Sequence, residues 1–206
     1  MSAAPFIYLA SQSPRRRQLL DQLGVRHELL LAGPDEDAEA LEAVHPGEAP
    51  AAYCERVTRL KLAAAVRRRR LRGLPPAPVL CADTTVALGR RILGKPLDAA
   101  DASATLRLLS GRTHRVLTAV AVSTGCRRGA RHWLALNTSR VRFAVLPRDV
   151  IAAYISSGEP FGKAGAYAIQ SSLAAWIARI EGSYSGVMGM PLFETAQLLA
   201  KARVRI

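Results

Sequence analysis

The sequence has few aromatic residues and few cysteines. Phe, Trp and Tyr make up 5% of its 206 residues, which is thin for the aromatic platforms that stack on single-stranded nucleic acid. The three cysteines, Cys54, Cys81 and Cys126, form no Cys-x-x-Cys pair and cannot all pair with one another. We therefore expect a protein of a reducing compartment, the cytoplasm, without a disulfide framework.

Long apolar runs and several common sequence patterns are also missing. No apolar run approaches the ~20 residues of a membrane-spanning helix, and residues 1–10 lack the basic and apolar regions of a signal peptide. The chain has no GxxxxGK(S/T) phosphate loop, no GxSxG motif and no histidine spacing typical of metal ligands. Its length, with 50% apolar residues, suits one sizeable domain or two small lobes.

Acidic residues are scarce relative to basic ones. The 29 basic and 16 acidic residues give a net charge of +13, which predicts an anionic partner. A small polyanionic ligand would explain only a few of the arginines, and runs such as 67–70 also suit a solvated helix end. A basic nucleic-acid-binding regulator, for instance of cell division, is therefore a second hypothesis. The low aromatic content and the absence of a helix-turn-helix or zinc pattern count against it.

Asp83 interrupts an apolar stretch. Residues 79–82 suit a buried strand, and a carboxylate there costs several kcal/mol unless a partner compensates it. A cation is the obvious partner, and Mg²⁺ binds one or two carboxylates together with water and substrate phosphates. The acidic turn 35–37, which contains Glu36, would supply further oxygens as a partner of Asp83, whereas taken alone an acidic turn is more commonly just solvated. The simpler alternative is that Asp83 ends a strand and caps a turn.

Three arginines open a predicted helix. Ser13 suits the N-cap and Pro14 the first helical position, so Arg15, Arg16 and Arg17 fall in the first turn. The helix dipole disfavours cations there by about a few tenths of a kcal/mol each. An anion in front of the helix reverses this cost, so the pattern predicts a phosphate site. The alternative is a set of solvated arginines on a surface helix.

Three more polar residues are candidates for the same site. Lys61 lies beside the apolar stripe of a predicted helix, where a lysine whose stem covers apolar surface is the alternative. Lys95 precedes a proline that restrains its backbone. Gln170 ends a predicted short strand, and its amide can both donate and accept, as reading a nucleobase edge requires.

Periodicity and turn residues predict the remaining elements. We expect strands at residues 7–10, 27–31, 79–82, 92–93, 116–122, 133–136, 141–145 and 167–170. We expect helices starting at residue 14 and spanning 48–71, 101–109, 147–157 and 191–202. Turns are predicted at 89–91 and 125–129, and a mobile loop at 182–190.

These motifs resemble the Maf family of nucleoside triphosphate pyrophosphatases, also described as septum-formation-inhibitor-like proteins. The resemblance lies in residues 9–16, 82–84, 93–96, 109–116, 167–170 and 182–191, and it runs almost from end to end in the right order. It implies one α/β domain over residues 1–206, with a long mixed sheet flanked by helices and a cleft between two lobes, related to inosine triphosphate pyrophosphatases. It also implies hydrolysis of a nucleoside triphosphate to the monophosphate and pyrophosphate with a divalent metal, Mg or Mn.

The resemblance also implies residue roles. Asp83 matches the catalytic base and, with Glu36, would hold the metal. The positions that match phosphate- and substrate-binding residues are Ser13, Arg15, Arg16, Glu36, Lys61 and Lys95, and those tied to base choice are Arg15, Thr84 and Gln170. Thr84 and the segment 167–170 look like the branch that cleaves dTTP and UTP, with modified pyrimidine nucleotides as further candidates, rather than the 7-methyl-GTP branch.

The chain departs from the family pattern at two places. Ser171 and Ser172 follow Gln170, where the family usually has glycine, and this concerns the shape of the base pocket. The hairpin turn is Gly89-Arg90 instead of the usual Asp/Asn-Gly. The sequence leaves the oligomeric state open, a homodimer included.

Overall fold

Three long strands form the centre of the computed structural model, which describes residues 4–34, 36–37, 40–124 and 129–206. They are β3 (Val79–Leu88), β5 (Thr113–Ser123) and β6 (His132–Phe143), and they pair antiparallel. On one side β1 (Ile7–Leu9) and β2 (His27–Leu29) continue the sheet in parallel, and on the other β7 (Ile177–Glu181) pairs antiparallel with β6. The predicted α/β fold with a mixed sheet is thus confirmed.

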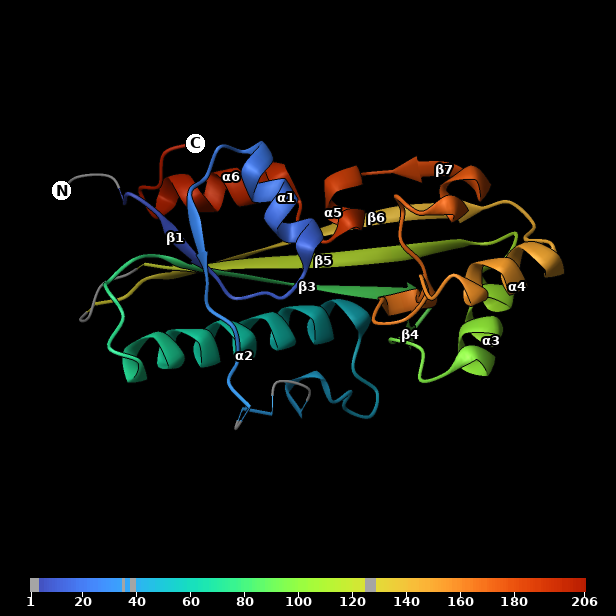
Figure 1. The fold of residues 1–206 in the computed structure, drawn as a ribbon, viewed down its shortest axis with the longest axis horizontal. Coiled ribbons are helices and arrows are strands. Elements are labelled where there is room, and N and C mark those ends of the chain that lie inside the picture. Colours follow the sequence, from blue (N-terminus) through green and yellow to red (C-terminus); the bar gives the residue numbers. More distant parts are fainter. Residues whose placement is uncertain (1–3, 35, 38–39, 125–128) are drawn as a thin grey trace.

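Helices cover both faces of the sheet at the end where β1 lies. Figure 1 shows α2 (Pro50–Leu71) on one face and α1 (Pro14–Gln22) with α6 (Leu192–Lys201) on the other. The alternation of side chains along β3 explains this arrangement. Leu80 packs in the cluster of α1 and α6, and Val79 in the cluster of α2. Residues 79–82 are apolar throughout because both faces of the strand are covered.

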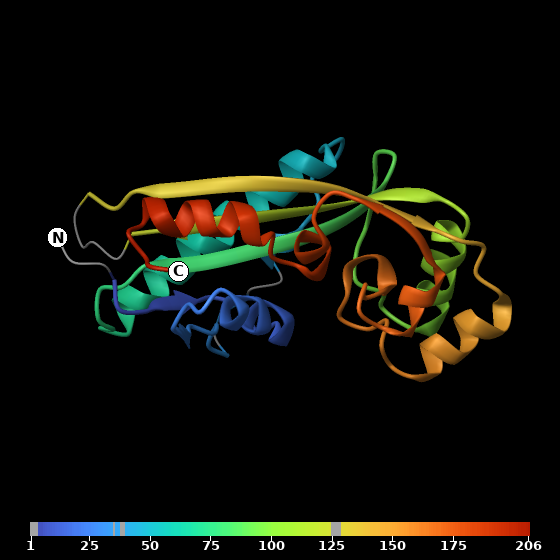
Figure 2. The ribbon, with the colours of Figure 1, turned by 90° about the horizontal axis from the view of Figure 1, so that it is seen from above.

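The other end of the sheet carries a separate core. Figure 2 shows α3 (Ala99–Leu109) and α4 (Arg148–Ser156) gathered around it, together with two 3₁₀ helices, Ala164–Ala166 and Ser172–Trp176. Phe143 of β6 lies within this cluster. We call the end with α1, α2 and α6 the first lobe and the end with α3 and α4 the second lobe.

The outer edge of β3 is open between the two lobes. Strand β1 pairs with Val79 and Leu80, and β4 (Arg91–Leu93) pairs with β3 from Val86 to Leu88. Within the described residues, 82–85 pair with β5 on one side and with no strand on the other. Side chains from both faces of β3 can therefore reach one opening at this gap.

Several sequence expectations on the fold are wrong. Residues 133–136 and 141–145 do not form two strands, since 132–143 form the single strand β6. The strand continues through the polar residues in its middle, where Asn137 bonds to Glu194 and Ser139 to Ser183. Asp83 lies within β3 and does not end a strand.

Two C-terminal segments also differ from the expectation. Residues 167–170 form no strand, because Ala166 adopts φ +59° and the Ser171 N–H closes a turn on the Ala168 carbonyl. The predicted loop 182–190 contains the short helix α5 (Tyr184–Met188), capped by the Ser183 hydroxyl. Strand β7 was not predicted, and most of the predicted turn 125–129, including Cys126, lies outside the described residues.

The remaining helices follow the sequence pattern closely. The N-terminal helix starts at Pro14 as expected, and α2, α3, α4 and α6 lie within about two residues of their predicted bounds, the usual scatter of helix ends. None of the helices in the described ranges combines the length and apolarity needed to cross a membrane.

Candidate active site

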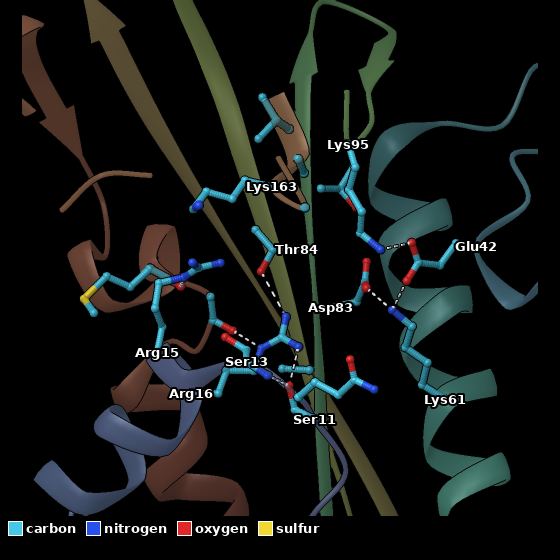
Figure 3. A pocket seen from close by; sticks show the side chains of 18 of the residues that line it. Ser11, Ser13, Arg15, Arg16, Glu42, Lys61, Asp83, Thr84, Lys95 and Lys163 are labelled. Carbon is cyan, nitrogen blue, oxygen red and sulfur yellow. Dashed lines mark hydrogen bonds and ion pairs between the residues drawn. The ribbon is translucent and has the colours of Figure 1, made fainter. Parts of the chain in front are cut away.

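A cleft of about 560 Å³ opens at the gap in the edge of β3, between the two lobes. Its walls come from the β1–α1 loop, α2, β3, the end of β4 with the segment after it, and the end of α5, together with residues 30–32, 41–42, 161–164 and 167–170. Figure 3 shows the polar side chains that converge there. The predicted site residues on its walls are Ser13, Arg15, Arg16, Lys61, Asp83, Thr84, Lys95 and Gln170.

Asp83 is compensated by a lysine. Its residue is 8% exposed, and its Oδ1 lies 2.5 Å from the Nζ of Lys61 on α2. Burial alone would lower the pKa of Lys61, but Asp83 and Glu42 together raise it above its ordinary value. Lys61 is therefore a charged partner and not merely a stem that covers apolar surface.

Glu42 is a cleft residue that sequence reasoning missed. It ends the 3₁₀ helix η1 (Ala40–Glu42), and its two oxygens lie 2.7 Å from Nζ of Lys61 and 2.9 Å from Nζ of Lys95. Burial would raise the pKa of Glu42, but the two lysines lower it below its ordinary value. The residue stands in a long connection without periodicity, so no local pattern marks it.

Arg16 joins the start of α1 to the segment after α5. Its guanidinium donates to the carbonyl of Gly189 at 2.8 Å and to the hydroxyls of Ser11 at 3.1 Å and Thr84 at 3.4 Å. Desolvation lowers the pKa of Arg16, while the nearby charge of Asp83 acts in the opposite direction. Arg15 donates to the carbonyl of Met188 at 3.3 Å. The two arginines are thus built into the site and are not simply solvated.

The N-terminus of α1 faces this group without an acidic residue in its first turn. Ser13 occupies the N-cap as predicted, but its side chain makes no capping bond. The Ser13 N–H instead donates to the Ser11 hydroxyl at 3.2 Å. Free amide groups and guanidinium groups at one helix start form an anion-binding arrangement.

Thr84 is held by a hydroxyl chain. Its Oγ1 lies 3.1 Å from that of Thr118 on β5, and Thr118 donates to the carbonyl of Gly186 at 2.7 Å. Since the Thr118 hydroxyl has one proton, Thr84 donates its own to Thr118 and accepts from Arg16. Thr118 was not predicted as a site residue, because a lone threonine in an apolar strand carries no recognisable signal.

The segment with Gln170 is fixed by the second lobe. The Tyr167 hydroxyl lies 2.7 Å from Nε2 of His114, and the Ala168 N–H donates to the Tyr154 hydroxyl at 3.2 Å. Ser171, which stands where the family usually has glycine, closes the following turn with its hydroxyl on the Ala168 carbonyl at 2.7 Å. Gln170 is left exposed at the cleft wall.

Comparison with known proteins decides the family. The family model described as Maf-like protein matches residues 6–202. The chain belongs to the Maf family. Proteins named dTTP/UTP pyrophosphatase from Polaromonas sp., Albidiferax ferrireducens and Ralstonia nicotianae are 62%, 65% and 63% identical to it. The alignments cover 100%, 94% and 98% of this chain and 100%, 95% and 96% of those proteins.

A solved structure is also similar at a lower level. It is described as a nucleoside-triphosphatase / dITP/XTP pyrophosphatase from Mycobacterium abscessus and is 18% identical, over 68% of this chain and 75% of its own, with a TM-score of 0.43. At this score the likeness carries no argument. None of these comparisons supports a nucleic-acid-binding regulator.

Glu36 is the one site residue expected from the Maf resemblance that does not line the cleft with Asp83. Its oxygens accept from the Arg68 guanidinium at 2.7–3.0 Å, and Arg72 lies 3.7 Å away. The hydrogen bond from Arg68 lowers the pKa of Glu36 to about 2. Arg68 itself lines the cleft, so Glu36 reaches the site through that arginine.

The donor set limits how a divalent metal would bind. The described residues contain no cluster of three or more His, Cys, Asp or Glu side chains fit to hold a metal ion. Asp83 remains a suitable single ligand, because Mg²⁺ commonly takes one or two carboxylates and completes its shell with water and substrate phosphates. Both oxygens of Glu36 accept from Arg68, and Glu36 does not line the cleft that contains Asp83.

Proposed function

We propose that this protein hydrolyses dTTP and UTP, cleaving the bond between the α- and β-phosphates to give the monophosphate and pyrophosphate. The observation that carries the proposal is a buried carboxylate, Asp83, facing cations from separate segments across one cleft. The names of full-length relatives more than 60% identical support the same reaction and the same pyrimidine substrates.

Catalysis of phosphoryl hydrolysis consists mostly of positioning and charge neutralisation. The side chains of the cleft have separate roles in it. Arg15 and the start of α1 bind phosphate oxygens from one wall of the cleft, and Lys95 from the other. Asp83 orients the attacking water and accepts its proton. Lys61 is placed to neutralise charge that develops beside the carboxylate.

A divalent metal, Mg or Mn, completes this scheme. Asp83 would hold it together with water and the triphosphate, and the ion would neutralise charge on the phosphate oxygens. Glu36 acts in this proposal by holding Arg68 at the cleft wall. Base choice rests on Arg15, Thr84 and Gln170, of which Thr84 is fixed by Arg16 and Thr118.

We place this activity in the cytoplasm, where nucleoside triphosphates are consumed. Cys54 and Cys81 are both buried and unpaired. Burial raises the pKa of their thiols to about 11 and about 12, so neither is a ready nucleophile and the chemistry falls to Asp83.

The first test is a panel of nucleoside triphosphates assayed for pyrophosphate release, with and without Mg²⁺ or Mn²⁺. We expect turnover of dTTP and UTP to exceed that of purine nucleotides and to require the metal. Release of orthophosphate in place of pyrophosphate, or no turnover of any nucleotide, would contradict the proposal.

The variant Asp83→Asn tests the base. We expect kcat to fall about 10²–10⁴-fold, the usual contribution of a general base, while nucleotide binding measured by calorimetry persists. Asp149→Asn, on the exposed first turn of α4, serves as the matched control and should hydrolyse dTTP like the wild type. An Asp83→Asn enzyme with wild-type turnover would remove Asp83 from its assigned role.

A further inference from the structure

Glu42 bridges two lysines of the cleft: Lys95, which the proposed function assigns to the phosphates, and Lys61, which it assigns to the charge that develops beside Asp83. Lys61 comes from α2 and Lys95 from the segment after β4, and each ammonium contacts a different oxygen of the same carboxylate. Figure 3 shows this pair at the cleft wall beside Asp83. The Glu42 side chain is 27% exposed, so it lies at the cleft surface and not within the core.

The contacts of Glu42 are those that a phosphate group would make. A carboxylate and a phosphate both accept charge-assisted hydrogen bonds from ammonium groups through two oxygens. A triphosphate that reached the same lysines would bring its negative charge beside that of Glu42, and like charges at such distances repel. A bound phosphate therefore weakens the contacts of Glu42 with these two lysines, and Glu42 weakens the binding of the phosphate.

We propose that Glu42 is an internal competitor for the phosphate chain and that it weakens the binding of the products, so that they leave the cleft. This inference rests on the proposed function. Because the carboxylate belongs to the same chain, it competes at a high effective concentration, on the order of mM for a short tether. Only a ligand that also contacts Arg15 and α1 gains enough to displace it from both lysines.

Product release follows from the same contacts. Once the bond between the α- and β-phosphates breaks, neither product spans the whole set of cations. Glu42 then returns to Lys61 and Lys95 and displaces the shorter phosphate. If Glu42 only held the two lysines in position for the substrate, its removal would weaken binding, which is the opposite effect.

The variant Glu42→Gln tests the inference. Glutamine keeps the size of the side chain and removes its charge. We expect the KM for dTTP and the inhibition constant of pyrophosphate to fall about threefold to tenfold, the range set by two partly exposed ion pairs. We expect kcat to stay level or fall, because the products leave more slowly.

Glu48→Gln is the matched control. Glu48 stands on the same connection before α2, pairs with Arg56 at 2.7 Å and does not line the cleft. Its variant should leave both constants unchanged. In a Lys95→Gln background, Glu42→Gln should change KM less, because one of its two contacts is already gone.

The outcomes separate this inference from the proposed function. Pyrophosphate binding is measured by calorimetry, which needs no turnover. An unchanged or raised KM in Glu42→Gln, with pyrophosphate binding no tighter than in the wild type, overturns the inference while hydrolysis by the wild type stands. A wild type that releases no pyrophosphate, but whose Glu42→Gln variant binds pyrophosphate more tightly, overturns the proposed function and leaves Glu42 a competitor for anions.

Discussion

Arg16 shows how a single side chain holds a positive charge in the cleft without a carboxylate contact. Its hydrogen bonds go to the neutral oxygens of Ser11, Thr84 and Gly189, and the charge of Asp83 acts on it only through space. A guanidinium bound in this way is fixed in direction but not neutralised. It remains available to attract an anionic ligand.

The variant Arg16→Lys tests this role at the residue scale. A lysine cannot reproduce the planar fork, so it loses one or two charged hydrogen bonds of about 1.5–3 kcal/mol each. We expect kcat/KM for dTTP to fall roughly ten- to a hundredfold by the same principle. Arg17→Lys, at the exposed next position, should leave kcat/KM unchanged. Equal kinetics for the two variants would refute the role of Arg16.

Local chemistry explains which site residues could be found from the sequence. Asp83 in an apolar run and the arginines after Pro14 each violate a local preference, so they stood out without a structure. Glu42 and Thr118 violate none, and their roles arise only from contacts with residues distant in the sequence. The contact of Glu36 with Arg68 could not be predicted, because an acidic turn looks the same whether it faces a metal or an arginine.

At the scale of the element, β3 determines where the key side chains of the site lie. Its open edge between β1 and β4 lets Asp83 and Thr84, on opposite faces of the strand, serve one cleft. Helix periodicity predicted the helices well because it depends on near neighbours. The continuity of β6 and the turn at 167–170 depend on partners across the sheet and in the second lobe, and for that reason they were predicted wrongly.

Gly165 is where the 3₁₀ helix Ala164–Ala166 packs onto β3. It adopts φ +70°, and an added Cβ would lie 2.8 Å from Cγ1 of Val86. We expect Gly165→Ala to lower the free energy of unfolding by about 2–4 kcal/mol, from a left-handed backbone together with overpacking. Urea denaturation measures this change.

Gly162→Ala is the control for that packing. Gly162 has nearly the same φ, +71°, but an added Cβ would meet nothing within 4 Å. Its variant should lose only the backbone contribution of about 1–2 kcal/mol. Equal losses at the two positions would mean that the contact with Val86 costs nothing.

At the scale of the molecule, two apolar cores share one sheet, and the second contains a buried histidine. His114 is 1% exposed, stacks on Phe143 and bonds to Tyr167 through Nε2, while its Nδ1 has no partner among the described residues. Burial lowers the pKa of His114 to about 4. His114 therefore stays neutral in the folded protein at pH values at which the unfolded chain binds a proton.

The stability of the whole protein should depend on pH through this group. Between pH 6.5, the ordinary value for histidine, and pH of about 4, the unfolded state binds more protons, so stability falls as the pH falls. The slope due to His114 approaches about 1.4 kcal/mol per pH unit. Urea titrations should show a shallower slope in His114→Gln, whereas a variant at the exposed His132 should keep the wild-type slope.

The bond between Arg16 and Gly189 joins residues 173 positions apart in the sequence. The cleft of a chain under synthesis is therefore incomplete until the segment after α5 has left the ribosome. A nascent or prematurely terminated chain that carries Asp83 and every lysine of the cleft still lacks the Gly189 carbonyl that fixes Arg16.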